Sequence, residues 1–533
     1  MMKKGLLISF ILSGFLVYGQ EKLDETVYLH VNSTNVLTGE SLHFSAYARS
    51  ESSGEMIDLS RLLYVELIDR KGESRLQEKV ELIDGRGDGR LFIPLELETG
   101  VFQLVAYTRW MKNTPSWYRQ PLTIINPYKS YSASDSLTDQ AKLRPLLKDQ
   151  MITQGTLPSY EKSSAIHFEE NIGEASTLSV SVSRINDLSF RKDIDSVQIV
   201  TTQKEHDINY YPEYQYGIIQ GKSKFTDFWV SSSFQSNEME VDVLKLDPYG
   251  NFLLYYDPSN ISTGVGSLIS NMTWNGNLDI YPEFYDGYPS FRNPSLEFSD
   301  SILADIKARS IHSQLMNAYR DLSASISEKS SSAFLPGDDV RVFVLDEYKR
   351  FSSMRNTFIE LIFEVAASKN EKNFDLSIRS EYIGTNKAQR KPLILLDGIW
   401  VSGKEILGIS PYLVEKIEIV TEDYFIGEYA FHGIISVHTF KNDFGGADLS
   451  SPLFQILPTQ KSQNLSSVKV DIEKLRHPRL EHLLYWDPQV EHPGGDLSID
   501  FYSSNFSGVY EMSIRGVTTS GESVSVVRYF RVE

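Results

Sequence analysis

The sequence predicts a mainly β protein with sandwiches in tandem and one α+β domain. Three observations support this fold class. Short stretches in which apolar and polar residues alternate recur along the chain, and turn residues separate them. Aromatic residues, which favour the half-buried positions of strands, make up 12% of the chain. The 533 residues are enough for roughly three to five domains, because single cores rarely grow beyond a few hundred residues.

Net charge and cysteine content narrow the class of function. The formal net charge of −19 argues against nucleic acid and anionic lipid as partners, because phosphate binding depends on a basic surface. The chain contains no cysteine, which excludes disulfides, a lipid-anchoring cysteine and a cysteine thioester. Hydrophobic residues at 41% and charged residues at 23% are typical of globular domains.

Residues 1–19 have the pattern of a secretory signal peptide. Lys3 and Lys4 give the positive start, and Gly5–Leu16 is the apolar region. This region is too short for a membrane-spanning helix, and no later apolar run approaches the roughly 20 residues that one needs. We therefore expect an exported chain that begins near Gln20 and has no transmembrane segment, located in the periplasm or on the cell surface.

Residues 20–128 are expected to form an antiparallel sandwich of about seven strands. Its strands are expected at Val27–Val31, Leu42–Tyr47, Leu62–Ile68, Leu91–Ile93 and Val101–Tyr107. Gly85, Gly87 and Gly89 are expected to form the turn before the fourth of them. Arg86–Asp88 within this turn spells an adhesion tripeptide, but so short a motif often occurs by chance.

The same domain resembles the macroglobulin-like domain of the α2-macroglobulin family. The matching residues are Tyr28, Leu29, Gly39, Glu40, Phe92, Pro94, Gly100, Leu104, Ala106, Tyr107 and Thr108. The resemblance implies an immunoglobulin-like sandwich. A protease-trapping function is the less favoured implication, because a chain without cysteine forms no thioester and no long bait segment stands out.

Residues 129–165, rich in serine, are expected to be a linker, and residues 166–300 a second β region. A strictly alternating strand is expected at Ser176–Ser183. Farther on, Asp247–Gly250 is expected to turn the chain into a returning strand at Asn251–Tyr256. This turn and the strands on either side of it resemble the transthyretin-like domains attached to many receptors of Bacteroidota.

Residues 278–295 are rich in aromatic residues and interrupted by prolines. Tyr285 and Tyr288 in this segment are candidate binding residues for a glycan or a peptide. The favoured interpretation is a loop whose rings pack over a sheet, because aromatic loops usually bury their rings.

Residues 301–445 are expected to form the α+β domain. Helices are expected at Ser301–Leu322 and Ser353–Ala367, both packed against its sheet. The segment Leu345–Phe351 is expected to be a loop with one buried aromatic. The strands of the sheet are expected at Leu393–Leu396, Ile417–Val420 and Gly433–Thr439.

The order of parts in this domain resembles the plug domain of TonB-dependent outer-membrane receptors. The matching residues are Leu395, Leu396, Asp397, Gly398, Pro411, Val414, Ile417, Ile419, Gly433, Ile434, Ile435, Val437 and Thr439. The chain after Phe440 is far too short for the barrel of such a receptor. The resemblance therefore implies a plug-like domain without a pore, with Asp397 and Gly398 as candidate interaction residues.

Residues 446–467 are expected to be a second linker, and residues 468–533 a closing sandwich. Its strands are expected at Leu484–Pro488, Asp496–Tyr502, Gly508–Arg515 and Ser523–Val532. This part resembles the closing β domain of macroglobulin-like Bacteroidota proteins that also carry the plug-like unit. The order of the modules, more than any one motif, carries the resemblance to these envelope proteins.

No motif in the sequence predicts catalysis. Nucleophile elbows, zinc-protease helices and phosphate-binding glycine loops are absent from the sequence. His477, His482 and His492 lie near Glu481 and Glu491, but their irregular spacing is poor for a metal site, and surface histidines are favoured. We expect no metal, no cofactor and no enzymatic activity.

The sequence thus predicts a non-enzymatic envelope protein that acts through protein–protein contacts. The resemblances imply an outer-membrane β-barrel complex as partner, serving transport, barrel assembly or secretion. This step from fold to function is an analogy. The alternative is a glycan- or peptide-binding envelope module centred on Tyr285 and Tyr288, and a protease trap without thioester ranks below it.

Overall fold

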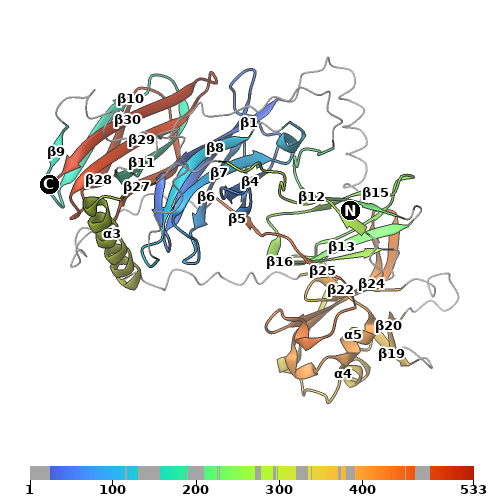
Figure 1. Ribbon diagram of the computed structural model, residues 1–533. Helices are drawn as coiled ribbons and strands as arrows, with labels where there is room; N and C mark the ends of the chain where they lie inside the picture. Colours follow the sequence, from blue (N-terminus) through green and yellow to red (C-terminus); the bar gives the residue numbers. More distant parts are fainter. Residues whose placement is uncertain are drawn as a thin grey trace. The chain divides into compact units, whose positions relative to one another are not determined.

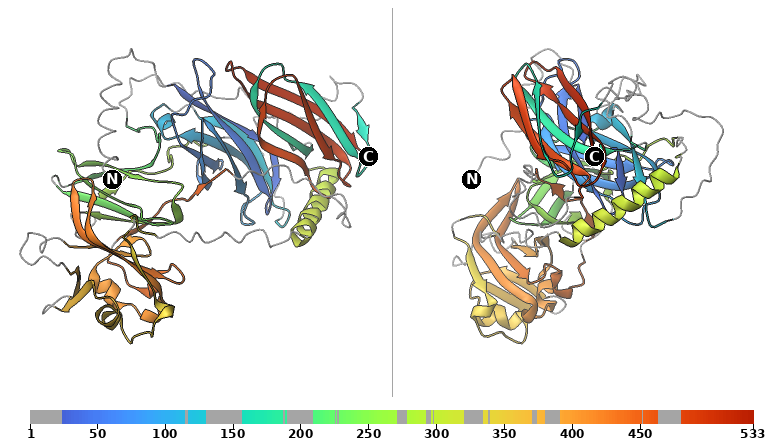
Figure 2. Two further views of the ribbon diagram at one scale, coloured as in Figure 1. Left: turned by 180° about the vertical axis from the view of Figure 1, so that it is seen from behind. Right: turned by 90° about the vertical axis from the view of Figure 1, so that its left-hand side faces the viewer.

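The computed structural model describes residues 24–129, 157–189, 209–270, 278–319, 334–379, 391–462 and 480–533, apart from a few positions inside these ranges. These residues form two compact units, which are drawn in Figure 1 and Figure 2. Unit 1 takes residues 216–283 and 327–458, and unit 2 takes residues 22–215, 284–326 and 459–533. Each unit is therefore assembled from segments that are far apart in the sequence.

The N-terminal part of unit 2 is a sandwich of two sheets. One sheet has the order β1-β3-β6, formed by Glu25–Val31, Ser41–Ser50 and Arg86–Phe92. The other has the order β2-β8-β7-β4-β5-β26, formed by Asn35–Leu37, Tyr118–Ile125, Gly100–Thr108, Leu62–Ile68, Ser74–Glu81 and Thr459–Gln460. Leu29 and Phe44 of the first sheet and Val65 and Leu104 of the second belong to one buried core.

This sandwich contains each strand that the sequence predicts, but it has more strands than the seven expected. It also includes two parallel pairs, β2 with β8 and β5 with β26. The extra strands were missed because β2 and β26 are only two or three residues long and carry no alternating pattern. A short 3-10 helix, η1 (Trp110–Asn113), follows β7 and buries Met111.

The glycines near residue 87 do not all serve the turn that was expected of them. Only Gly85 lies in the turn, with a φ of 75° that other residues adopt at a cost. The other two lie inside β6, where a Cβ at Gly89 would come within 2.8 Å of the ring of Phe44. Asp88 of the tripeptide is buried in the same strand, so the motif is not displayed on a loop.

The other sandwich of unit 2 joins strands from distant parts of the chain. Its larger sheet has the order β27-β11-β29-β30-β9, formed by Leu483–His492, Ser176–Ile185, Gly508–Thr518, Ser523–Val532 and Ser159–Tyr160. Its smaller sheet pairs β10 (Ala165–Asn171) with β28 (Asp496–Tyr502). The core contains Leu178, Ile514 and Phe530. The four strands expected in the closing sandwich are all present.

The sheets of this sandwich do not follow the domain boundaries that the sequence suggested. Strand β9 falls within the expected linker 129–165, and β10 and β11 fall at or beyond its end, in what was assigned to the transthyretin-like region. All three pair with strands of the closing sandwich instead. Alternation in a sequence identifies a strand but says nothing about its partner, which is why the assignment was wrong.

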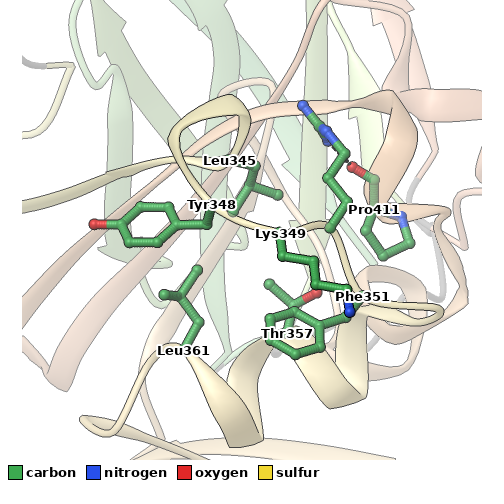
Figure 3. Close-up of a pocket in the computed structure, with 8 residues that line it drawn as sticks. Leu345, Tyr348, Lys349, Phe351, Thr357, Leu361 and Pro411 are labelled. Carbon is green, nitrogen blue, oxygen red and sulfur yellow. Dashed lines mark hydrogen bonds between the residues drawn. The ribbon is translucent and has the colours of Figure 1, made fainter.

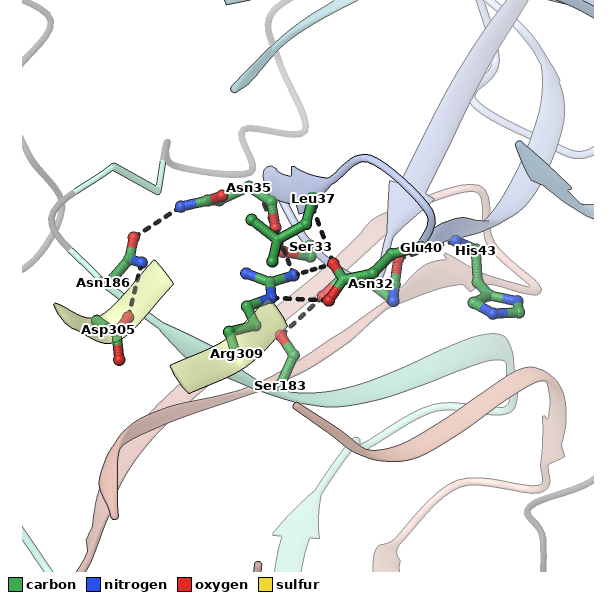
Figure 4. Close-up of polar contacts among 10 residues, drawn as sticks. All are labelled: Asn32, Ser33, Asn35, Leu37, Glu40, His43, Ser183, Asn186, Asp305 and Arg309. Atoms are coloured by element: carbon green, nitrogen blue, oxygen red, sulfur yellow. Dashed lines mark hydrogen bonds and ion pairs between the residues drawn. The ribbon is translucent and has the colours of Figure 1, made fainter. Parts of the chain in front are cut away.

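Helix α3 (Asp300–Tyr319) belongs to unit 2, whereas the sequence analysis placed it against the α+β sheet. Its Ile306 packs against Leu37. Arg309 donates from Nε and Nη2 to the two carboxylate oxygens of Glu40, at 3.0 and 2.6 Å (Figure 4). The predicted packing was wrong because an apolar stripe shows that a helix is covered, not which sheet covers it.

The same helix contacts the second sandwich. Arg184 of β11 forms an ion pair with Asp305 at 2.6 Å. The ring of Phe506 is contacted by the imidazoles of His312 and His482, with centroids 4.5 and 5.0 Å away. Both ring nitrogens of His482 are buried, which corrects the expectation of a surface histidine.

The first domain of unit 1 is a third β-sandwich. One sheet has the order β15-β12-β17, formed by Asn251–Tyr256, Gly217–Ser223 and Leu278–Ile280. The other has the order β14-β13-β16-β25, formed by Val241–Lys245, Trp229–Ser236, Ile261–Ser270 and Leu453–Gln455. The turn predicted after β14 is present, and Asp247 accepts from the backbone of Tyr249 and Asn251 at 2.8 and 2.7 Å. Strand β25 lies in the stretch expected to be a linker at 446–467.

The second domain of unit 1 has the α+β architecture that the sequence predicts. Its sheet has the order β18-β23-β24-β21-β22, formed by Arg341–Val344, Val414–Ile426, Tyr429–Thr439, Leu393–Leu396 and Ile399–Trp400. A hairpin of β19 (Val365–Lys369) and β20 (Phe374–Ile378) accompanies it. The helical elements are α4 (Met354–Glu360), α5 (Gly403–Gly408), η3 (Leu345–Glu347), η5 (Pro411–Leu413) and η6 (Phe444–Gly446). The three predicted strands are confirmed.

The helix predicted at 353–367 is only half as long. Ser353 caps α4 by accepting from the backbone N–H of Asn356 at 3.2 Å, as a helix start requires. The helix ends at Glu360, and Val365 begins β19. Short apolar runs fit helical and extended periods equally well, and here the β-branched valine belongs to a strand.

The fold class is confirmed: the chain is mainly β, with sandwiches and one α+β domain. The signal peptide expected at 1–19 lies outside the described residues. Among the described residues, none of the helices α3, α4 and α5 is both long enough and apolar enough to cross a bilayer.

Candidate interaction surface

The structure places Asp397 and Gly398 inside unit 1. They form the two-residue turn between β21 and β22, with φ of 48° and 85°. The Asp397 carboxylate accepts from the backbone N–H and the hydroxyl of Thr439, both at 2.7 Å, and from the backbone N–H of Phe444 at 2.8 Å. A Cβ on Gly398 would meet the carbonyl oxygen of Phe234 at 2.3 Å. Both residues are buried, so they shape the domain and present no surface.

Tyr285 and Tyr288 pack on the first sandwich of unit 2. Tyr288 donates to Glu66 Oε1 at 2.7 Å, and burial raises the pKa of its phenol, with the Glu66 charge adding to the effect. The backbone N–H of Tyr285 donates to the hydroxyl of Tyr107 at 2.8 Å. Both rings contact Trp117, with centroids 4.4 and 5.2 Å away. The loop therefore matches the interpretation in which its rings cover a sheet.

The histidines provide no metal centre within the described residues. His482 packs on an aromatic ring, and burial lowers its pKa well below the ordinary value, with Arg309 and Arg184 adding to the effect. His492 Nε2 lies 3.3 Å from the carbonyl oxygen of Gly495. His477 lies outside the described residues.

The α+β domain carries a cluster of exposed aromatic and apolar side chains. Tyr348 is 42% exposed, Tyr412 63%, Leu413 45% and Phe440 46%. They come from the loop after η3, from η5 and from the residue after β24. We call these four residues together with Arg350 the Arg350 surface, because Arg350 ties its parts together.

Arg350 links the three segments of this surface. Its Nε donates to Asp346 Oδ1 at 3.0 Å, and its Nη1 donates to the carbonyl oxygens of Val414, at 2.9 Å, and of Pro411. The guanidinium carbon lies 5.4 Å from the centre of the Phe440 ring. A guanidinium has five N–H donors in a rigid plane, so these contacts fix the loop, η5 and the end of β24 against one another.

A shallow surface depression, with no enclosed space for a water molecule, lies beside this surface (Figure 3). It is lined by Leu345, Tyr348, Lys349, Arg350, Phe351, Thr357, Leu361 and Pro411. Small-molecule sites are usually concavities of about 300–1,000 Å³, so this depression is not a small-molecule site.

Sequence reasoning missed this surface. It expected one buried aromatic in Leu345–Phe351, yet the buried residue is Leu345 and Tyr348 is exposed. Aromatic residues and arginine are enriched at protein interfaces, and the two segments of this surface together supply both. The signal is present in Tyr348–Phe351 and in Pro411–Leu413, but only the fold brings the two segments together.

Comparison with known proteins gives structural neighbours only. No family model matches the chain, and no curated protein matches its sequence. Elastase-activated α-2-macroglobulin of Escherichia coli overlays with a TM-score of 0.25 and 8% identity, over 96% of this chain and 44% of that chain. Salmonella α-2-macroglobulin gives a TM-score of 0.26 and 9% identity, over 98% of this chain and 40% of that chain.

A third neighbour is dimeric latent PorU from Porphyromonas gingivalis. It overlays with a TM-score of 0.17 and 10% identity, over 48% of this chain and 33% of that chain. The chain spans less than half the length of each of these structures. Overlays with TM-scores this low say nothing about architecture or activity. The fold is therefore assigned from the sheets described above.

Proposed function

We propose that this protein is a non-enzymatic scaffold of the cell envelope that binds a partner protein through the Arg350 surface. The exported location is inferred from residues 1–19, which have the pattern of a signal peptide. It takes the partner, an outer-membrane β-barrel complex, from the resemblance of the α+β domain to receptor plugs. The sequence resemblance to macroglobulin-like envelope proteins fits the same role.

The exposure of the Arg350 surface is the observation that supports the proposal most directly. Soluble proteins expose single apolar residues everywhere, but here several exposed aromatic residues lie on segments that one arginine ties together, and aromatic residues and arginine are enriched at interface cores. The backbone segments that carry these side chains are held by hydrogen bonds, such as that from Phe440 to Leu413 at 3.1 Å, so binding would need to order little backbone.

Paired substitutions at the rim of the surface test this function. Tyr412→Ser with Leu413→Ser removes two exposed side chains without touching the core. Tagged full-length protein, purified from detergent-solubilised envelopes, is expected to lose its stoichiometric partner in this variant. The control is Tyr249→Ser, which changes a 76% exposed tyrosine in the turn before β15.

Two results would sink the proposal. One is retention of the partner by the folded Tyr412, Leu413 variant at the level of the control. The other is an equal loss of partner in the Tyr249→Ser control. Deleting residues 392–440 is a poor substitute for these variants, because it removes four of the five strands of the sheet.

A further inference from the structure

One strand of unit 2, β30, has an outer edge that is covered only at its end. On its inner side β30 pairs with β29 along its whole length. On its outer side β9 pairs only with Arg531 and Val532, and Figure 1 shows β9 at this end of the strand. Among the residues that the structure describes, no strand pairs with the outer edge at 524–528.

The backbone groups of this run point outward at alternate residues. The N–H of Arg531 donates to the carbonyl oxygen of Pro158 at 2.8 Å, on the side of β9. Because successive residues of a strand direct their backbone groups to opposite edges, those of Ser525 and Val527 point to the same side as those of Arg531. No described residue accepts from the N–H of Ser525 or Val527, and the carbonyl oxygen of Val527 accepts only from the guanidinium of Arg528, at 3.1 Å. The run therefore offers backbone groups to an added strand.

The side chains of the run give the edge little protection. Lysine, proline or a bulge usually keeps an exposed edge from pairing, but this run reads Val-Ser-Val-Val-Arg and its register with β29 is regular. Val524 and Val526 face the core of the sandwich and are only half-buried. The one charged residue, Arg528, is paired with Glu170 of β10 at 2.5 Å. Charge thus does little to keep another strand away.

The run is complementary to a second copy of itself. In an antiparallel pair centred on Val526, Ser525 lies opposite Val527 of the second copy, and these residues direct their N–H and carbonyl groups at each other. Val524 lies opposite Arg528, so no two like charges face each other. The two Val526 side chains meet at the centre, in a pair without hydrogen bonds, where facing side chains are closest. Any other centre leaves part of the run unpaired.

We propose that two copies of this chain pair through residues 524–528 of β30, antiparallel and about a twofold axis at Val526. A twofold contact between identical surfaces is the commonest kind in homo-oligomers. The inference is independent of the Arg350 surface and goes beyond the proposed function. Because the paired run is short, the dimer is expected to be weak and to dissociate on dilution.

Single cysteines test the register, because the chain has none of its own. Val526→Cys in the full-length protein is expected to form a disulfide between two copies under mild oxidation, since Cα atoms in such a pair are about 4.5 Å apart. Val524→Cys is the matched control, because its two copies would lie roughly 13 Å apart along the strands, too far for a disulfide. At equal protein concentration, the linked fraction at 526 is expected to exceed that at 524 by at least about tenfold.

Sedimentation equilibrium of the full-length protein gives the second readout. The natural chain is expected to show a dimer fraction that rises with concentration. Val526→Lys places two ammonium groups opposite each other and is expected to remain monomeric. Ser498→Lys, on an exposed position of β28, is the control and is expected to dimerise as the natural chain does.

The alternative occupant of the edge is a strand from a different protein. With p-benzoylphenylalanine in place of Ser525, irradiation of intact envelopes is expected to give an adduct of two copies of this chain. An adduct with another protein instead would overturn self-pairing. Equal linking at 524 and 526, or a natural chain that is monomeric at every concentration, would overturn it as well. None of these results bears on the Arg350 surface, so the proposed function is tested separately.

Discussion

Asp397 joins three parts of the α+β domain through its side chain. Its carboxylate accepts from the backbone N–H and hydroxyl of Thr439 at the end of β24 and from the backbone N–H of Phe444, while its own backbone adopts the left-handed conformation of the turn. Aspartate tolerates this conformation better than most residues. One side chain therefore joins the end of β21, the end of β24 and η6.

Replacing this residue tests its role. Asp397→Ala is expected to destabilise the domain by about 2–4 kcal/mol, because it leaves buried donors without an acceptor and strains the turn. Hydrogen exchange at the amides of Thr439 and Phe444 measures the effect. Asp448→Ala changes an exposed carboxylate of the same domain and serves as the control; equal protection in the two variants would contradict the role.

The sequence predicts the local conformation of the candidate residues but not their burial. The Asp397–Gly398 turn was predictable, because the pair Asp-Gly favours the positive φ values that a two-residue hairpin needs. Its burial was not, because Gly398 is covered by the backbone of Phe234, more than a hundred residues earlier in the chain. Tyr348 was missed for the same kind of reason, since exposure depends on distant segments.

Helix α3 is the element whose attachment the structure explains best. It is held by the buried pair of Arg309 with Glu40 on one sandwich and by the pair of Asp305 with Arg184 on the other. An ion pair that is shielded from water contributes little net free energy to folding. Removing one partner is costly, however, because it leaves a charge without compensation. The helix is thus anchored at two points on unit 2.

Removing one anchor tests this view. Arg309→Ala is expected to weaken the docking of α3 by about 1–3 kcal/mol, because the half-buried Glu40 carboxylate loses its two charged hydrogen bonds. Amide exchange along residues 300–319 reports the local stability of the helix. Lys307→Ala, an exposed neighbour on the same helix, is the control, and protection that is equal in both variants would contradict the anchoring role.

The histidines beside α3 make its docking sensitive to acid. Burial lowers the pKa of His482 in the folded state, with Arg309 and Arg184 adding to the effect, and burial also lowers that of His312. When the pKa of a histidine is lower in the folded state than in the unfolded state, where it is near 6.5, the unfolded chain binds a proton more readily as pH falls. Protonation therefore favours the unfolded state. Stability is therefore complete above about pH 6.5 and declines below it.

The expected slope for one such group is about 1.4 kcal/mol per pH unit below pH 6.5. Exchange protection of α3, measured between pH 7 and pH 5, checks this dependence. His482→Phe keeps an aromatic ring against Phe506 and cannot be protonated. The slope of stability against pH is therefore expected to decrease by the contribution of one histidine. A variant whose slope equals that of the natural chain would show that His482 is not the titrating group.

At the scale of the whole molecule, the chain is organised by strand pairing between distant segments. Nearly every predicted strand is present, because alternation and turn residues are local signals. The partners of β9, β10 and β11 were not predictable in this way, since they lie more than 300 residues away in the chain. Among the described residues the chain passes between units 1 and 2 four times.

This organisation predicts the effect of truncation. Ending the chain after residue 462 removes β27–β30, so β11 loses both of its neighbours and β10 loses β28. Exchange protection is expected to vanish in residues 165–185 and to persist in β3, β4 and β7, which keep their partners. Strong protection of residues 176–185 in the truncated chain would contradict the observed pairing.

The central claim is that this protein works by holding a partner in the cell envelope. The most direct measurement is affinity purification of the tagged full-length protein from detergent-solubilised envelopes, followed by mass determination of the intact complex. The account predicts a stoichiometric complex with an outer-membrane β-barrel protein. Recovery of a solitary monomer, with no protein at comparable amounts, would contradict it.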